Sequence, residues 1–248
     1  MKAMLFAAGL GTRLQPLTDR LPKPLVPVAG RPMIEYPLLL LRHYGVTDII
    51  VNTHHLGAML RDHLADGAKL GVHITYSHET ELLDTGGGLL KARPFLDGGT
   101  FVVINSDVLI DLDLQAVIER HRASRAAATL VLRKDPDADR YGAIEISRDG
   151  RVRRFLKHEA PSMASAGPLE KFMFTGVQIL EPRIFDFMAG EGSRRFGTTT
   201  STYPKMLTED LRLEGFVFDG FWQDLGTPQR IQEAEARLAS GAAQLRYI

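Results

Sequence analysis

Short apolar runs alternate with amphipathic stretches through the first half of the chain. The runs AMLFAA, TDIIVNT, VHITYSH and FVVINSD predict strands, and the segments MIEYPLLLLRHYG, LGAMLRDHLADG, GGLLKARPFL and LQAVIERHRASR have the spacing of helices. Such alternation is typical of βαβ units, which build a mostly parallel central sheet with helices on both faces. We therefore expect an α/β, Rossmann-like fold whose ligand lies beyond the carboxyl ends of the strands.

The pattern changes after residue 126. The runs ATLVLRK, YGAIEIS, RVRRFLK and FMFTGVQIL, with a turn at Asp149-Gly150, predict β-hairpins added to the sheet. Near the C-terminus, a helix is predicted over 227–240. Thr227 is a typical N-cap residue, Pro228 is favoured at the first helical position, and Gly241 is typical of the position after a helix ends. Pro37 lies inside a helical pattern, and the pattern leaves open whether it starts or kinks that helix.

Composition narrows the class of protein. The 248 residues can bury the core of one α/β domain, and Lys+Arg and Asp+Glu are equal at 30 each, so no global field recruits nucleic acid or an anionic membrane. The chain has no cysteine and no apolar run of transmembrane length. We expect a cytoplasmic protein that binds neither nucleic acid nor membrane.

The stretch FAAGLGTRLQPLTDRLPKPLVPVAG, residues 6–30, directly follows the first predicted strand. It lacks the third glycine of a dinucleotide-binding turn and contains no P-loop. Its glycines nevertheless allow backbone N–H groups to approach a phosphate, and Arg13 and Lys23 supply positive charge. The prolines on either side of Lys23 restrict the backbone there. We predict a phosphate cradle.

The same stretch resembles the signature of sugar-1-phosphate nucleotidylyltransferases. The resemblance continues through LLDTGGGLLKA, NSD at 105–107, YGAIEI, FTGVQIL and FWQDLGTPQR, in the order found in that family. It implies an enzyme with a single nucleotidyltransferase domain over 1–248. Within it, residues from about 1–125 would bind nucleotide, residues from about 126–226 would bind sugar phosphate, and a helix would span 227–240. The left-handed β-helix of many longer members is not expected.

The resemblance also assigns residues to the site. The nucleotide would be bound by the first segment and by the LLDTGG segment, that is, by Ala8, Gly9, Gly11, Thr12, Thr85 and Gly86. Arg13 and Lys23 would contact the triphosphate and the reacting phosphates as catalytic residues. Asp107 and Asp224 match the two carboxylates that hold Mg²⁺ in the family. Magnesium commonly takes one or two protein carboxylates plus phosphate oxygens, so a pair of aspartates is chemically sufficient.

The nucleobase is expected to be read at Glu79, where relatives carry a glutamine. An ionised carboxylate only accepts hydrogen bonds, which favours guanine or uracil over adenine and cytosine. The alternative interpretation is that Glu79 is a solvated acid of a loop. Guanine offers two donors to a carboxylate and uracil one, so the prediction leans slightly toward GTP.

The sequence defines the sugar 1-phosphate substrate less well than the nucleotide. Many relatives carry a Glu-Lys pair, whereas this chain has Leu156 before Lys157; the phosphate contact of Lys157 is expected to remain. Gly142 and Thr175 resemble further lining residues. Some segments resemble mannose-1-phosphate guanylyltransferases and others N-acetylmuramate-1-phosphate uridylyltransferases. Mannose 1-phosphate with GTP is therefore weighed against N-acetylmuramate 1-phosphate or glucose 1-phosphate with UTP.

Other interpretations stay open at this point. A regulatory relative could bind nucleotide sugars without chemistry, although both cations and both aspartates are present. Asp111-Leu112-Asp113 spells the Asp-x-Asp metal motif of glycosyltransferases, but a helix cap explains it better. His54 and His55 are interpreted as structural, because neighbouring strand residues point to opposite faces. A homo-oligomer stays an open alternative, because the sequence does not define the oligomeric state.

Overall fold

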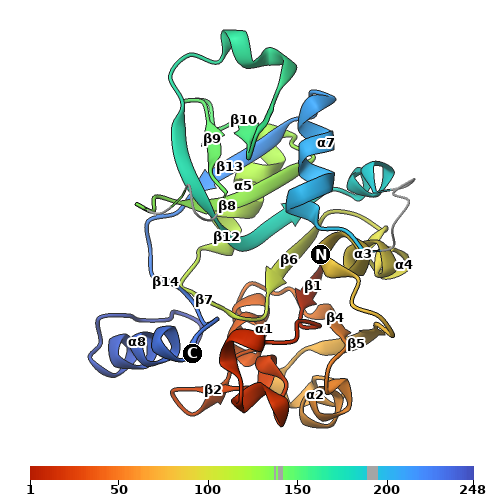
Figure 1. The fold of residues 1–248 in the computed structure, drawn as a ribbon, viewed down its shortest axis with the longest axis vertical. Coiled ribbons are helices and arrows are strands. Elements are labelled where there is room, and N and C mark those ends of the chain that lie inside the picture. Colours follow the sequence, from red (N-terminus) through yellow and green to blue (C-terminus); the bar gives the residue numbers. More distant parts are fainter. Residues whose placement is uncertain (137, 139–141, 189–194) are drawn as a thin grey trace. The chain divides into compact units, whose positions relative to one another are not determined.

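The computed structural model describes residues 1–136, 138, 142–188 and 195–248 (Figure 1). The chain forms two compact units. Unit 1 consists of Met1–Leu82, Val103–Leu112 and Gly220–Ile248, and unit 2 of Leu83–Val102 and Asp113–Asp219. The functional division at about residues 125 and 226 stays a prediction.

Unit 1 is built on parallel strands. Its strands are β1 (Lys2–Phe6), β2 (Pro27–Val28), β3 (Arg31–Pro32), β4 (Asp48–Thr53), β5 (His73–His78), the end of β6 (Phe101–Asn105), β7 (Val108–Ile110) and β14 (Trp222–Asp224). The strands β6, β1, β4 and β5 are neighbours in that order, and β1–β4 and β4–β5 run parallel. Because β1, β4 and β5 run parallel, their carboxyl ends meet at one edge of the sheet, and their apolar residues are buried.

The helices of unit 1 are α1 (Glu35–His43), α2 (Gly57–Leu64) and α8 (Pro228–Ala239). Pro37, whose role the sequence left open, is the third residue of α1. The first four N–H groups of a helix have no partner within it, so a residue without an N–H is accommodated in this turn. Pro37 therefore belongs to the start of the helix.

Unit 2 carries mainly antiparallel strands. Its elements are α3 (Asp84–Lys91), α4 (Arg93–Leu96), α5 (Leu114–Ser124), β8 (Ala128–Arg133), β9 (Ile144–Ile146), β10 (Val152–Phe155), β11 (His158–Glu159), β12 (Glu170–Leu180), α7 (Tyr203–Thr208) and β13 (Leu213–Val217). The pairs β9–β10, β10–β11, β9–β12 and β8–β12 are antiparallel, and β8–β13 is parallel. Tyr141, the first residue of one predicted strand, lies outside the described residues.

The predicted α/β class, with a mostly parallel sheet, helices on both faces and added antiparallel hairpins, is confirmed (Figure 1). The short pair β7–β14 and the strand β13 were missed, because runs of three to five residues carry little periodic signal. Within the described parts of the chain, every helix is too short or too polar to cross a bilayer.

The C-terminal helix begins and ends as predicted. The Thr227 side chain accepts a hydrogen bond from the Arg230 N–H at 3.3 Å, Pro228 is the first residue of α8, and Gly241 follows its end with a φ of +73°. A hydroxyl at the N-cap satisfies one of the backbone donors that the helix leaves without a partner.

We predict that Thr227→Ala lowers the free energy of unfolding by about 1 kcal/mol, the usual cost of losing an N-cap. Denaturant unfolding followed by circular dichroism measures this change. The matched control is Ser240→Ala at the other end of α8, where only an exposed hydroxyl bonds the Arg237 carbonyl. Equal effects of the two substitutions would contradict the cap.

Candidate active site

The loop after β1 folds tightly around a glycine. Gly11 has a φ of +67°, and a Cβ on it would lie 2.9 Å from both Lys23 Cβ and Thr18 Cγ2. Only glycine therefore fits where the loop approaches the segment that carries Lys23. A short 3₁₀ helix, Thr12–Leu14, follows and leaves Arg13 exposed, while nothing lies within 4 Å of a Cβ on Gly9.

Lys23 forms an ion pair with Asp107 at the edge of the sheet. The ammonium Nζ contacts the carboxylate Oδ2, with the two side chains 13% and 24% exposed. Asp107 reaches this place because β6 ends at Asn105 and the next N–H, of Ser106, donates to the Phe6 carbonyl at the end of β1. The two residues predicted as catalytic cation and metal ligand are thus in contact.

Asp224 lies beside Asp107 through the pair β7–β14. In its antiparallel register Asp224 is opposite Val108, and the Leu225 N–H donates to the Asp107 carbonyl at 2.9 Å. Asp224 Oδ2 accepts from Arg230 Nη1 at 2.7 Å, and Oδ1 accepts from the Gly226 N–H at 2.5 Å. Both predicted metal ligands therefore stand at neighbouring positions of unit 1, each paired with a cation.

Arg13 completes this cluster. A Cβ on Gly226 would lie 2.6 Å from Asp224 Oδ1 and 2.7 Å from Arg13 Nη2, so the guanidinium and the carboxylate both border this glycine. We call Arg13, Lys23, Asp107 and Asp224 the charge cluster. It consists of two carboxylates and two cations from segments about 200 residues apart in the chain.

The donor set suits a hard divalent cation. Within the described residues no group of three or more His, Asp and Glu side chains gathers to hold a metal. Two adjacent carboxylates are nonetheless what Mg²⁺ takes when substrate phosphates and waters complete its shell. Asp107 and Asp224 fit that role, and a metal bound there would act as a Lewis acid toward phosphate oxygens.

Glu79 is not solvated. The residue is 1% exposed, directly follows β5, and accepts a hydrogen bond from Asn52 Nδ2 at 2.7 Å on Oε1. The alternative of a solvated loop acid is therefore wrong. Asn52 at the end of β4 in turn accepts from the Ala7 N–H through Oδ1 at 2.6 Å. The predicted base reader is thus connected to the beginning of the cradle.

Thr85 and Gly86 lie in the first turn of α3, in unit 2. The N–H groups of Gly86 and Gly87 donate to the Phe196 carbonyl at 2.8 and 3.2 Å, and the Thr85 hydroxyl accepts from the Thr198 N–H at 2.9 Å. In this structure the N-terminal amides of α3 are thus satisfied by the chain itself. The predicted role of these residues in nucleotide binding stays a prediction.

The predicted sugar-phosphate residues also belong to unit 2. Lys157 is exposed in the turn between β10 and β11, next to Leu156, whose φ of +54° is unusual for leucine. Leu156 packs over Gly142, and the Leu156 N–H donates to the Ala143 carbonyl at 3.2 Å. Thr175 is buried in β12 and donates to the Val131 carbonyl at 2.8 Å. Leu156, the neighbour of Lys157 in the chain, thus lies over Gly142, whereas Thr175 is buried in the sheet.

The two competing motifs have structural roles. Asp113 caps α5 by accepting from the Ala116 N–H at 3.1 Å, as the sequence indicated. Asp111 pairs with Arg246, and its hydrogen bonds raise the pKa of that guanidinium. Because β4 ends at Thr53, His54 and His55 follow the strand, so the premise that they lie on it was wrong. They contact the Glu79 and Thr18 carbonyls at 2.9 and 3.0 Å.

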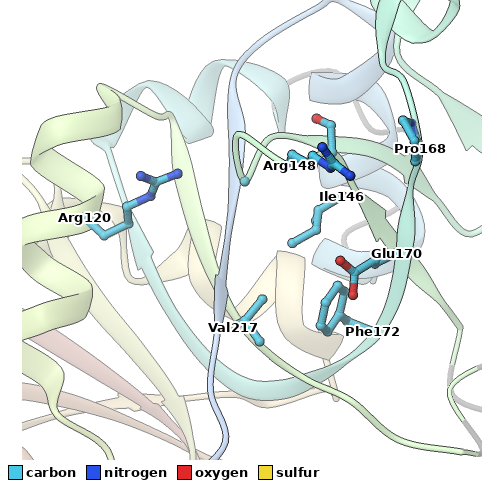
Figure 2. A pocket seen from close by; sticks show the side chains of 9 residues that line it. Arg120, Ile146, Arg148, Pro168, Glu170, Phe172 and Val217 are labelled. Carbon is cyan, nitrogen blue, oxygen red and sulfur yellow. The ribbon is translucent and has the colours of Figure 1, made fainter.

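Unit 2 contains a cavity of about 290 Å³, and Figure 2 shows the side chains that line it. Ile146, Phe172 and Val217 form its apolar wall, and Arg120 and Arg148 stand at its rim. Arg120 is already engaged, since it donates to the Asp149 carbonyl at 2.6 Å and pairs with buried Glu214. None of the predicted site residues lines this cavity, so it is not the predicted site.

Three residues that contact the charge cluster or Glu79 were not predicted from the sequence. Arg230 and Gly226 lie within FWQDLGTPQR, where the resemblance drew attention to Asp224 alone. Asn52 is the second-last residue of β4 and follows the apolar run Ile49–Val51, and a buried asparagine at that place signals a polar group that needs a partner.

Comparison with known proteins identifies the family. The chain matches the family described as Nucleotidyl transferase over residues 2–241. It is 34% identical to the UTP–glucose-1-phosphate uridylyltransferase of Synechocystis over 91% of its own length and 60% of the relative's. It is 36% identical to the N-acetylmuramate alpha-1-phosphate uridylyltransferase of Neisseria meningitidis over 95% and 97%. It is 32% identical to the mannose-1-phosphate guanylyltransferase of Mycobacterium tuberculosis over 97% and 65%.

A solved structure supports the same conclusion. The fold matches a Bacillus anthracis crystal structure, in complex with sucrose, of a protein described provisionally as a glucose-1-phosphate thymidylyltransferase. The TM-score is 0.81 at 25% identity, and the match covers 95% of this chain and 94% of the other. The resemblance of the sequence motifs to sugar-1-phosphate nucleotidylyltransferases is thereby confirmed, and the chain belongs to the Nucleotidyl transferase family.

Proposed function

We propose that this enzyme transfers a nucleotidyl group from a nucleoside triphosphate to a sugar 1-phosphate in a Mg²⁺-dependent reaction that yields a nucleoside-diphosphate sugar and pyrophosphate. The observation that carries the proposal is the charge cluster, in which Lys23 contacts Asp107 and Arg13 and Asp224 border the same glycine. Triphosphate recognition needs cations, and a metal site needs carboxylates; both occur at one edge of unit 1.

The reaction requires no side-chain nucleophile. An anionic oxygen of the sugar phosphate forms a bond to the α-phosphorus of the triphosphate, and the bond between that phosphorus and the bridging oxygen breaks. The bonding electrons leave with pyrophosphate. Two anions must approach each other in line, so positioning and charge neutralisation supply the catalysis.

Arg13 and Lys23 perform the neutralising role. Arg13 can donate a planar pair of hydrogen bonds to phosphate, and Lys23 provides a compact charge beside it. Lys23 is paired with Asp107, which limits the cost of holding its charge partly buried, whereas Arg13 is exposed beside Gly226. Substrate phosphates would take over part of that pairing, while Asp107 and Asp224 would hold the metal.

Glu79 is the proposed reader of the base. Because an ionised carboxylate only accepts, it selects guanine or uracil, and the two donors of guanine favour GTP slightly. Glu79 is 1% exposed and its Oε1 accepts a hydrogen bond from Asn52, so its carboxylate is held in one orientation. The relatives named above include both a guanylyltransferase and uridylyltransferases, which keeps UTP as the alternative.

For the sugar, mannose 1-phosphate is proposed, with N-acetylmuramate 1-phosphate or glucose 1-phosphate as the alternatives that go with UTP. The named relatives act on each of these three sugar classes. Lys157, exposed in its turn next to Gly142, would contact the sugar phosphate. A cytoplasmic location is part of the proposal, in keeping with a chain that contains no cysteine.

The proposal predicts Mg²⁺-dependent pyrophosphate release from GTP with mannose 1-phosphate. A matrix of four nucleoside triphosphates and three sugar 1-phosphates, with mannose, N-acetylmuramate or glucose as the sugar, tests it. Release with UTP instead would keep the mechanism and transfer the sugar assignment to the N-acetylmuramate or glucose class. No release with any pair, while nucleotide still binds, would contradict catalysis and favour a regulatory nucleotide-sugar-binding protein.

We predict that Arg13→Ala and Asp107→Asn each lower kcat by about a hundredfold or more, the size expected when one electrostatic stabiliser is lost. Steady-state kinetics with the best substrate pair measure the loss, and circular dichroism verifies folding. The matched controls, Arg20→Ala and Asp19→Asn, change exposed residues of the same loop. A loss below about tenfold in either test variant would remove that residue from the mechanism.

We predict that Glu79→Gln reduces the preference for GTP over ATP, expressed as kcat/KM, by about tenfold or more, because the new amide can donate to a bare ring acceptor. Competition between the two nucleotides measures the ratio. Glu81→Gln is the control, as an exposed acid two residues away. An unchanged ratio in Glu79→Gln would show that another group selects the base.

A further inference from the structure

The first peptide after β1 is held from both sides. Its carbonyl, that of Phe6, accepts from the Ser106 N–H at 3.1 Å, directly before Asp107. Its N–H, that of Ala7, donates to Asn52 Oδ1 at 2.6 Å. This peptide is the entrance of the predicted cradle, so the path of the cradle is fixed where it leaves the sheet.

Asn52 takes the place of a backbone acceptor. The paired register of β1 with β4 ends at Leu5 and Val51, whereas β4 and β5 stay paired through Asn52 and Thr53. The strands β1 and β4 thus separate just where the cradle begins. A side-chain carbonyl reaches the Ala7 N–H across that opening, and a buried N–H without an acceptor would cost free energy.

The other end of the Asn52 amide holds Glu79. Because Oδ1 must face the Ala7 N–H donor, Nδ2 faces the Glu79 carboxylate, to which it donates at 2.7 Å. Asn52 and Glu79 are 3% and 1% exposed, so water does not screen this contact. The Glu79 backbone is fixed as well, since its N–H donates to the Thr53 carbonyl at 2.7 Å.

We propose that Asn52 is a positioning residue for the nucleotide: one buried amide fixes both the entrance of the phosphate cradle, through Ala7, and the carboxylate that reads the base, through Glu79. The proposal rests on the proposed function for the roles of the cradle and of Glu79. Asn52 does not touch the reacting atoms. Its effect is to set the two ends of the nucleotide site relative to each other, so it acts on nucleotide affinity and leaves the chemical step unchanged.

The test is Asn52→Asp, alone and combined with Glu79→Gln. The single substitution keeps an acceptor for Ala7 but places a carboxylate against the Glu79 carboxylate. We expect KM for the nucleotide to rise about tenfold or more and kcat to change less than about threefold. In the double variant the glutamine amide donates to the new carboxylate, and KM should fall to within about threefold of the Glu79→Gln single variant.

Binding of inorganic tripolyphosphate, measured by calorimetry, separates the cradle from base reading and from catalysis. Tripolyphosphate has no base, so its weaker binding to Asn52→Asp and its recovery in the double variant would exclude base reading as the cause. Ser77→Ala, a buried polar residue paired with Asn52 in register, should bind it as the wild type does. Failure of all nucleotide turnover would refute the proposed function, whereas this readout would still decide the role of Asn52.

Unchanged KM and tripolyphosphate affinity in Asn52→Asp would overturn the proposal, as would a double variant no better than the single one. Should Asn52→Asp unfold, amide hydrogen exchange at Ala7 decides the matter. Exchange should accelerate about tenfold or more in Glu79→Ala, which leaves Nδ2 without its acceptor, and less in Glu79→Gln, which keeps one. Equal Ala7 exchange in these two variants would overturn the coupling.

Discussion

The ion pair between Lys23 and Asp107 is the contact on which the site depends. It joins residues 84 positions apart in the sequence and places a cation and a carboxylate together at the carboxyl edge of a parallel sheet. Neither group is fully buried, and each offsets part of the desolvation of the other. The same arrangement recurs next to it, where Asp224 is paired with Arg230 and borders Arg13 through Gly226.

This balance explains how a chain with equal numbers of acidic and basic residues can have a site for highly charged substrates. The proposed attraction for phosphate is local, because the cations Arg13 and Lys23 lie on the loop that follows β1. Asp107, which pairs with Lys23, and Asp224 are also suited to bind a metal. The backbone that carries the loop is held by Ser106 on one side and Asn52 on the other, so the cluster rests on a fixed frame.

Much of this could be predicted from the sequence, and the reasons differ between residues. Periodicity gave the long strands and helices, and cap chemistry gave the start of α8 at Thr227. The motif order gave Lys23, Asp107 and Asp224. The role of Asn52 could not be predicted from the sequence. Its contacts with Ala7 and Glu79 span 45 and 27 residues and depend on which strands are neighbours in the sheet. The sequence allowed Glu79 to be either a solvated acid of a loop or the reader of the base. Only the fold shows that its side chain is buried.

Asp107 and Asp224 are proposed to act together as a metal site for a bound nucleotide. Electron paramagnetic resonance of Mn²⁺, used in place of Mg²⁺ because it prefers the same oxygen ligands, measures this directly in the presence of a non-hydrolysable GTP analogue. Each of Asp107→Asn and Asp224→Asn should weaken nucleotide-dependent Mn²⁺ binding by about tenfold or more. Mn²⁺ bound as tightly by the double variant as by the wild type would contradict the account.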